Sequence, residues 1–392
     1  MTIDNSIRGD RRTGNDVEFS DRCVLSDENA MTAFMMGFPT LKAILREIPT
    51  MFSANLLNQY STTHYLDVAQ QFGIPGDVCP MPEAEAGISI DDDFPVLGKC
   101  AVQVNTTCDG SLMGNGIIAK RLEREYGIPT FQLVAPMRHR EEDVQEYAAQ
   151  DMKNAIAFVE EKMGVKWDWK AYFECAKRVN ETTRNRWEWL EVNSTPYPQF
   201  VGAVFSLYND TNYMGNCGRS AEFPPIDKKI MKLVRQGYER KTMMAPEYRH
   251  RCIVRGVQPQ YVIDMLNWMV HCWGVVPLTD MLSMVISKEI AEEDTPENRE
   301  QAYYDMAYLT ENMIMRNRTH GGYKALTGMH GQFEEQARER GLHLVWVCHD
   351  LCDPRVYTRQ AIRDQFNVYM RTVMREEPLD PSIEVLPDEN AW

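Results

Sequence analysis

The sequence lacks the features that define several common classes of protein. None of its 10 cysteines form a Cys-x-x-Cys pair, which argues against a zinc ribbon, and 10 in 392 residues are too few for a disulfide scaffold. No apolar run approaches the ~20 residues that a membrane span needs. The first residues, MTIDNSIRGDRRTGNDVE, lack the apolar core of a secretory signal. We therefore expect a cytoplasmic protein with reduced cysteines.

Other absences exclude chemistry. The chain has no glycine-rich dinucleotide fingerprint and no P-loop lysine motif, which argues against nicotinamide binding and ATP hydrolysis by this chain. It has no Gly-x-Ser-x-Gly elbow, which weakens the hypothesis of a hydrolase. The formal net charge of −15 argues against nucleic acid or an anionic membrane as a partner.

The order of apolar runs and amphipathic stretches predicts an α/β fold with mostly parallel sheets and additional helices. A chain of 392 residues is too long for one typical core. We expect two α/β domains facing each other across a cleft, with their special residues at strand ends. The predicted bounds are an N-terminal arm and helix over 1–54, a first domain over 55–200, a second domain with a helical insert over 201–375, and an extended acidic tail over 376–392.

Most of the functional interpretation of the sequence depends on one stretch, Lys99–Gly116. Ala101–Val104 predicts a buried strand, which gives way to Asn-Thr-Thr and then Cys108. Three glycines follow before a helix that we expect to begin near Ile117. A strand that feeds a helix through such a bend is a typical ligand site, because backbone N–H groups point outward at the helix start. The alternative is a buried structural cysteine in an ordinary turn.

Three further residues are candidates at predicted loops. Cys79 follows Gly-Ile-Pro-Gly-Asp-Val and precedes a proline. His320 lies in Asn-Arg-Thr-His-Gly-Gly, where it is either a hydrogen-bonded loop histidine, a cluster ligand or a general acid–base. Cys352 lies in Asp-Leu-Cys-Asp-Pro-Arg, and its thiol is not needed for the turn. Thiolates hold iron–sulfur clusters, but the spacing of Cys79 and Cys108 fits no short ferredoxin motif.

The ordered set of these segments resembles a known family. The segments that carry the resemblance are GIPGDVCP (73–80), NTTCDG (105–110), YGIPTFQL (126–133), RCIVRG (251–256), NRTH (317–320) and DLCDPRVYT (350–358). Together they resemble the 2-hydroxyacyl-CoA dehydratase family, which also contains the B-type subunit of ATP-dependent benzoyl-CoA reductase. The resemblance implies two flavodoxin-like domains with an active-site [4Fe-4S] cluster at their junction. It also implies a related second subunit in a heterodimer, a separate ATP-dependent electron activator and an acyl-CoA substrate.

By this resemblance, Cys79 and Cys108 match the first two cluster thiolates of the family. The family would carry a third cysteine where this chain has His320, so His320 is the expected replacement ligand, with Cys352 as a lower-ranked substitute. Asn105, Thr106 and Thr107 are placed to donate hydrogen bonds to the cluster sulfurs.

The resemblance implies one-electron, ketyl radical chemistry of the 2-hydroxyacyl-CoA dehydratase type. One alternative is a subunit of an aryl-CoA reductase of the benzoyl-CoA type. A second is a non-catalytic partner subunit without a family-type cluster, as the missing third cysteine would allow. A third is an iron-free thiol redox protein.

Overall fold

The computed structural model describes most but not all of the chain. The described residues are 21–26, 32–45, 61–92, 98–105, 109–134, 142–202, 204, 208, 212, 216–255, 264–280, 288–311, 343–346 and 359–384. Cys108, His320 and Cys352 lie outside these residues, as do the strand predicted at 312–316 and the helix predicted at 323–340.

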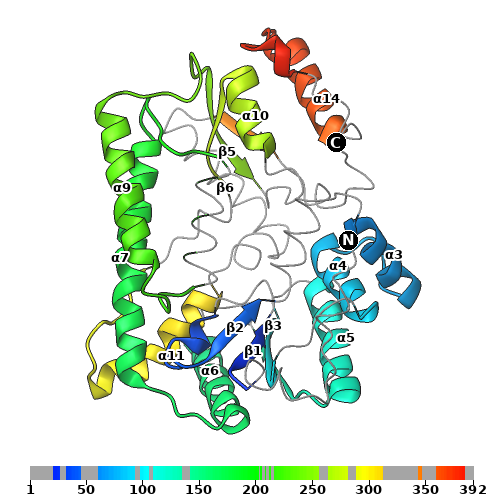
Figure 1. Cartoon of the computed structure of the whole chain (residues 1–392), viewed down its shortest axis with the longest axis vertical. Coiled ribbons are helices and arrows are strands. Elements are labelled where there is room, and N and C mark those ends of the chain that lie inside the picture. Colours follow the sequence, from blue (N-terminus) through cyan, green and yellow to red (C-terminus); the bar gives the residue numbers. More distant parts are fainter. Residues whose placement is uncertain are drawn as a thin grey trace. The chain divides into compact units, whose positions relative to one another are not determined.

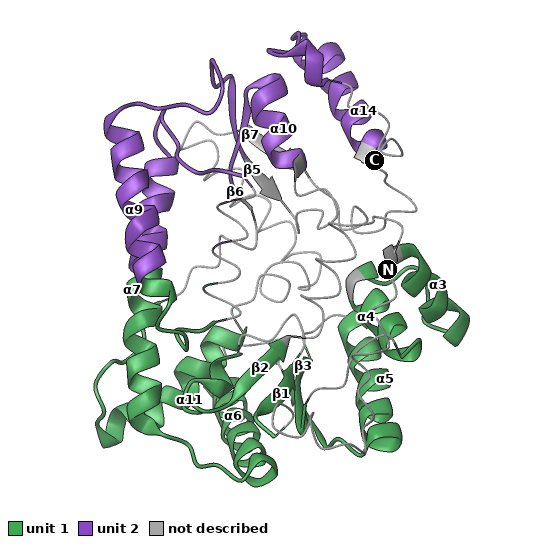
Figure 2. Ribbon diagram, viewed as in Figure 1, with its two compact units in different colours: residues 1–183, 211–224, 285–326 green, residues 184–210, 225–284, 327–392 purple. Residues whose placement is uncertain are grey.

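The chain divides into two compact units, each assembled from three separate segments (Figure 2). Unit 1 comprises Met1–Thr183, Thr211–Pro224 and Val285–Leu326, and unit 2 comprises Arg184–Asp210, Pro225–Met284 and Thr327–Trp392. The domain bounds expected from the sequence are contiguous, and they stay a prediction.

Unit 1 is built on a four-stranded parallel sheet. Its strands are β1 (Cys23–Ser26), β2 (Lys42–Leu45), β3 (Cys100–Asn105) and β4 (Thr130–Val134), in the order β2-β1-β3-β4. This is the start of the order 2-1-3-4-5 that characterises flavodoxin-like folds. β1 and β3 are buried along their whole length.

The two N-terminal strands correct the prediction of an arm and helix over 1–54. Cys23–Ser26 is not part of an arm, because it pairs with β2 on one side and β3 on the other. The apolar stretch after it forms a short 3-10 helix, η1 (Thr32–Met35), and then β2. Strands of four residues are too short to show a period that distinguishes them from a helix.

Helices cover the sheet of unit 1 and pack on one another. They are α3 (Ser61–Phe72), α4 (Pro80–Ile90), α5 (Asp109–Tyr126), α6 (Glu142–Met163), α11 (Pro296–Glu311) and the first part of α7 (Trp169–Asn193). The sheet side of α5 places Ile118 and Leu122 against Leu25 and Ala101. Figure 1 shows α4 beside α5, and α3 packs against α4 in turn.

Unit 2 contains a second, three-stranded parallel sheet. Its strands are β5 (His250–Arg255), β6 (Val275–Asp280) and β7 (His343–Trp346), in the order β6-β5-β7. The accompanying helices are α9 (Phe223–Glu239), α10 (Asp264–Trp273) and α14 (Arg359–Tyr369), which continues into the π-helix η5 (Met370–Met374). Trp268, Met269 and Trp273 of α10 form the centre of a core that includes Ile362 of α14. The two parallel sheets with their helices confirm the predicted α/β class.

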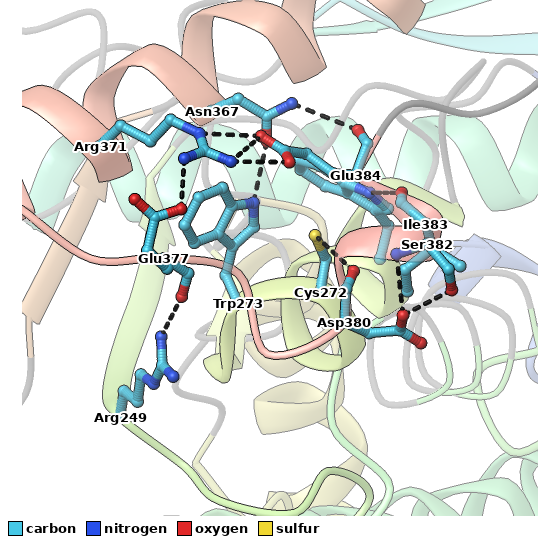
Figure 3. A network of polar contacts seen from close by, with 11 residues as sticks. Arg249, Cys272, Trp273, Asn367, Arg371, Glu377, Asp380, Ser382, Ile383 and Glu384 are labelled. Carbon is cyan, nitrogen blue, oxygen red and sulfur yellow. Dashed lines mark hydrogen bonds and ion pairs between the residues drawn. The ribbon is translucent and has the colours of Figure 1, made fainter.

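The first part of the predicted acidic tail is a docked segment, which corrects the expectation of an extended tail over 376–392. Figure 3 shows Arg371 bound to both Glu377 and Glu384, and Nη2 of Arg371 lies 2.8 Å from Oε2 of Glu384. Asn367 accepts a hydrogen bond from Nε1 of Trp273 (2.9 Å) and donates one to the backbone oxygen of Glu384 (3.2 Å). The segment also forms a short 3-10 helix, η6 (Pro381–Ile383). The carboxylates of Glu377 and Glu384 thus hold this segment to Arg371 of η5, where the sequence predicted an extended tail.

No helix among the described residues is both long enough and apolar enough to cross a membrane.

Candidate functional site

The carboxyl edge of the unit 1 sheet, at β1 and β3, is the place where ligands bind in flavodoxin-like sheets. β1 pairs only with the first residues of β3, Cys100 and Ala101. Ser26, the last residue of β1, donates a hydrogen bond to the backbone oxygen of Val102 (3.1 Å). β3 therefore continues beyond the residues that pair with β1, and it ends at Asn105.

Cys79 is placed by a turn between two helices. α3 ends at Phe72, and Gly73 follows with a φ of 109°, a conformation that favours glycine. The chain then turns through Pro75, and Cys79 occupies the N-cap position of α4. Among the cysteines that the structure describes, Cys79 is the one that is not buried. Its predicted position on a loop is confirmed.

Two glycines of α5 bring this helix against Cys79. A Cβ atom built on Gly110 would lie 3.5 Å from Cβ of Cys79 and 2.9 Å from Cγ of Pro82. A Cβ atom built on Gly114 would lie 2.9 Å from the backbone oxygen of Pro82. The absence of side chains at both positions therefore lets the start of α5 touch the start of α4.

This contact corrects the expected start of the helix. The glycines at 110, 114 and 116 were expected to form a bend before Ile117, but α5 begins at Asp109 and contains all three. Glycine is unfavourable inside a helix by about 0.5–1 kcal/mol relative to alanine. The close approach of α4 explains why glycine is nevertheless present at positions 110 and 114. A Cβ atom built on Gly116 has no atom within 4 Å, so this reason does not apply there.

A chain of amide hydrogen bonds fixes the end of β3. Nδ2 of Asn115, on α5, donates to the backbone oxygen of Val104 (3.3 Å) and to Oδ1 of Asn105 (3.2 Å). Nδ2 of Asn105 in turn donates to Oε1 of Gln132 on β4 (2.9 Å). Asn105 was expected to bond a cluster sulfur, and the structure gives its side-chain amide these other partners.

The other described cysteines have the properties of core residues. Burial raises the pKa of the Cys100 thiol to about 12, and burial also raises the pKa of Cys252. Both lie inside strands. A thiol that stays protonated at neutral pH is a poor metal ligand, because the thiolate is the binding form.

Residues that sequence reasoning missed lie on α4 and α5. Glu83 and Glu85 of α4 are only 1% and 5% exposed, although carboxylates are rarely buried. The backbone N–H of Glu83 donates to the backbone oxygen of Cys79 (3.4 Å), which places Glu83 one turn after the cysteine. This helix was not predicted because prolines occur at positions 80 and 82, although proline is compatible with a first helical turn.

The structure tests only part of the predicted ligand set. Cys108 lies between Asn105 and Asp109, which are described, but Cys108 itself, His320 and Cys352 are not. Within the described part of the chain, no three side chains of histidine, cysteine, aspartate or glutamate gather as a metal-binding group. The roles of Cys79, Cys108, His320 and Cys352 stay predictions.

The parallel strand order β2-β1-β3-β4 defines unit 1 as a flavodoxin-like α/β unit, with Cys79 at the start of α4 against the start of α5. Residues 48–370 match the family described as 2-hydroxyglutaryl-CoA dehydratase, D-component, and the chain belongs to this family. The suspected relationship to 2-hydroxyacyl-CoA dehydratases is thereby confirmed. No curated protein matches the chain.

Proposed function

We propose that this chain is a subunit of an iron–sulfur enzyme that acts on an acyl-CoA thioester by one-electron chemistry of the 2-hydroxyacyl-CoA dehydratase type. The family match over residues 48–370 supports the enzyme class. The observation that carries the proposal is the contact between Cys79 and the start of α5. It links the two cysteines expected to hold the cluster.

The contact and the covalent chain together limit how far apart these cysteines lie. Gly110 touches Cys79, and Cys108 precedes Gly110 by two residues. Because consecutive Cα atoms are 3.8 Å apart, the Cα atom of Cys108 lies within about 7.6 Å of that of Gly110. Two thiolates joined in this way fit a shared cluster.

The proposed [4Fe-4S] cluster would be held by Cys79, Cys108 and His320, with Cys352 as the lower-ranked substitute for His320. When bound, it would supply a single electron to the thioester carbonyl. The chain's own contribution is to hold the ligands at the edge of the sheet and to keep water away from the acceptor. The alternative role proposed for His320, in place of iron binding, is that of the acid or base that moves a proton at the substrate.

The D-component description supports a multi-component enzyme. We infer a related second subunit, an ATP-dependent activator as electron donor, and a cytoplasmic location. The alternative reaction, reduction of an aryl-CoA of the benzoyl-CoA type, would use the same site. A non-catalytic partner subunit is favoured by one observation, the histidine at position 320 where the family would carry cysteine.

Iron and sulfide analysis after anaerobic purification tests the proposal. We expect iron and sulfide in the wild-type chain, with a cluster signal in its EPR spectrum, and loss of both in Cys79→Ala and Cys108→Ala. Cys100→Ala is the matched control, since it removes a buried thiol of the same unit. Iron retained in both loop variants would refute the ligand assignment, and a wild-type chain without iron would favour the non-catalytic subunit. Assays with a 2-hydroxyacyl-CoA and with benzoyl-CoA separate the two reactions.

A further inference from the structure

Helix α9 of unit 2 differs in charge from the rest of the chain. The chain has 57 acidic and 42 basic residues in total, but residues 228–238 contain four basic residues and no acidic one. The four are Lys228, Lys229, Lys232 and Arg235. Within an acidic protein, α9 is therefore a local source of positive potential.

One face of α9 is fixed against the rest of unit 2. Met231 and Val234 are buried with Trp189 of α7 in a hydrophobic cluster, and Figure 1 shows α9 beside α7. Arg235 donates two hydrogen bonds to the carboxylate of Glu188, from Nε to Oε1 (2.5 Å) and from Nη2 to Oε2 (2.7 Å). These contacts hold the helix on its inner side, and the ion pair neutralises the charge of Arg235.

The opposite face of α9 combines exposed apolar and basic side chains. Ile226, Lys229 and Leu233 are spaced by three and four residues, so they lie in one row along the helix. Ile226 is 46% exposed and Leu233 is 42% exposed, and Lys229 and Lys232 are exposed beside them. Neither of these two lysines makes an ion pair with any residue that the structure describes. We call these four residues the α9 patch.

The α9 patch has the composition of a protein-binding surface. Protein interfaces place apolar side chains at the centre and charged ones at the rim. Apolar residues seven positions apart on a helix, such as Ile226 and Leu233, are typical anchors in the recognition of a helix by a groove. Lysines at the rim attract a partner of opposite charge and raise the rate of association.

Charge complementarity favours an acidic protein over other occupants of the patch. A second copy paired about a twofold axis would bring the lysines of the two patches together, and each copy carries a net charge of −15. Insertion into a membrane needs a wide apolar face, and the apolar face of α9 is already packed against α7. Nucleic acid would bind through its phosphates, which leave the two apolar anchors without a partner.

We propose that the α9 patch is a docking surface for a partner protein whose surface is acidic and has apolar side chains at its centre. Lys229 and Lys232 attract the partner, and Ile226 and Leu233 become buried when it binds. The proposal goes beyond the proposed function and is independent of it, because it uses no cluster ligand and no residue of unit 1.

Fluorescence anisotropy with two synthetic peptides and the full chain tests the proposal. The first peptide is a glutamate-rich helix with two leucines seven residues apart, and the second has alanine in place of both leucines. At 0.1 M salt we expect the first peptide to bind about 10-fold or more tightly than the second, because its leucines bury apolar surface against the patch. Binding of both is expected to weaken at 1 M salt, where the screening length falls from about 10 Å to about 3 Å.

Two variants separate the charged from the apolar part of the patch. Lys229→Glu combined with Lys232→Glu is expected to weaken binding of both peptides about 10-fold or more, and Leu233→Ser is expected to weaken binding of the first peptide alone. Lys120→Glu combined with Lys170→Glu is the control, because it makes the same charge change at exposed positions of unit 1. All the altered side chains are exposed, and urea denaturation checks that each variant remains folded.

Several distinct results would overturn the proposal. No binding of either peptide, or an equal loss of binding in the control variant, would mean that the α9 patch is not a docking surface. Equal affinity for the two peptides would show that the apolar anchors take no part. Binding to phosphatidylserine vesicles or duplex DNA, or self-association in sedimentation, would assign the patch to another occupant if the paired lysine variant abolished it. None of these measurements involves iron, so each result leaves the proposed function unchanged.

Discussion

Individual cysteines of this chain differ mainly in burial. Cys100 lies in β3 with no exposed surface, whereas Cys79 lies at the start of α4 and is partly accessible. Burial disfavours the charged thiolate, which raises the pKa of Cys100 to about 12 from an ordinary value of 9.0. The two thiols of one unit are therefore suited to different roles, packing for Cys100 and reaction or metal binding for Cys79.

This difference predicts a labelling pattern. Iodoacetamide at pH 8 is expected to modify Cys79 in the native, metal-free chain and to leave Cys100 unmodified, because Cys100 is both inaccessible and protonated. Peptide mass spectrometry measures both sites, and labelling in urea is the control in which both react. Equal labelling of the two sites in the native chain would contradict the assignment.

The same thiol gives a pH dependence with a defined sign. The native state keeps the Cys100 proton up to a pH of about 12, whereas the unfolded chain loses it near 9.0. Between these values the native state binds more protons, so the free energy of unfolding is expected to fall as the pH rises through this window. Urea denaturation at pH 8 and pH 10 measures the fall, and Cys100→Ala is expected to reduce it.

At the scale of elements, close packing of α4 on α5 predicts opposite effects for two glycines of one helix. A Cβ atom at Gly114 would meet backbone of Pro82, so Gly114→Ala is expected to lower the free energy of unfolding by about 1–3 kcal/mol. A Cβ atom at Gly116 meets nothing within 4 Å, so Gly116→Ala is expected to raise it by up to about 1 kcal/mol. Urea denaturation measures both, and changes of the same sign would contradict the packing argument.

The docked C-terminal segment of unit 2 predicts a ranking of two substitutions. Asn367→Leu leaves the buried Nε1 of Trp273 without its acceptor, which is expected to cost about 1–3 kcal/mol of unfolding free energy. Arg371→Leu removes ion pairs to Glu377 and Glu384, but the arginine is 39% exposed and such pairs contribute about 0–1 kcal/mol. Thermal or urea denaturation of the two variants measures both losses of stability, and the loss is expected to be larger for Asn367→Leu. A larger loss for Arg371→Leu would show that the ion pairs dominate.

Features whose structure depends only on their own local residue pattern could be predicted from the sequence. The strand expected at 101–104 lies within β3, because a fully buried parallel strand is a largely apolar run. The position of Cys79 followed from Gly-Ile-Pro-Gly, whose turn chemistry is also local.

The remaining features depend on contacts between distant segments. β1 is a strand because β2 and β3 pair with it, and its four residues carry no period of their own. In the sequence, the glycines of α5 indicate a bend. The structure shows instead that Pro82 of α4 lies where side chains at Gly110 and Gly114 would be. The hydrogen bonds of Asn115 could not be predicted from the sequence, since they depend on the position of the β3 backbone across the helix–sheet interface.

At the scale of the whole molecule, the chain combines two α/β units with a net charge of −15. A net charge of this sign and size disfavours nucleic acid as a partner, because both molecules are negatively charged. The proposed ligands Cys79 and Cys108 both belong to segment Met1–Thr183 of unit 1. Cluster binding is therefore expected to stabilise the two units unequally.

Hydrogen exchange tests this inequality. A ligand that binds only the native state stabilises it, and the effect is greatest for the structure that must open to release the ligand. Anaerobic reconstitution with iron and sulfide is expected to slow exchange in peptides from α4 and α5 and to leave α9 of unit 2 unchanged. Cys79→Ala treated in the same way is the control and is expected to show no slowing. Equal protection of α9 would mean that the iron is bound elsewhere or that the two units open together.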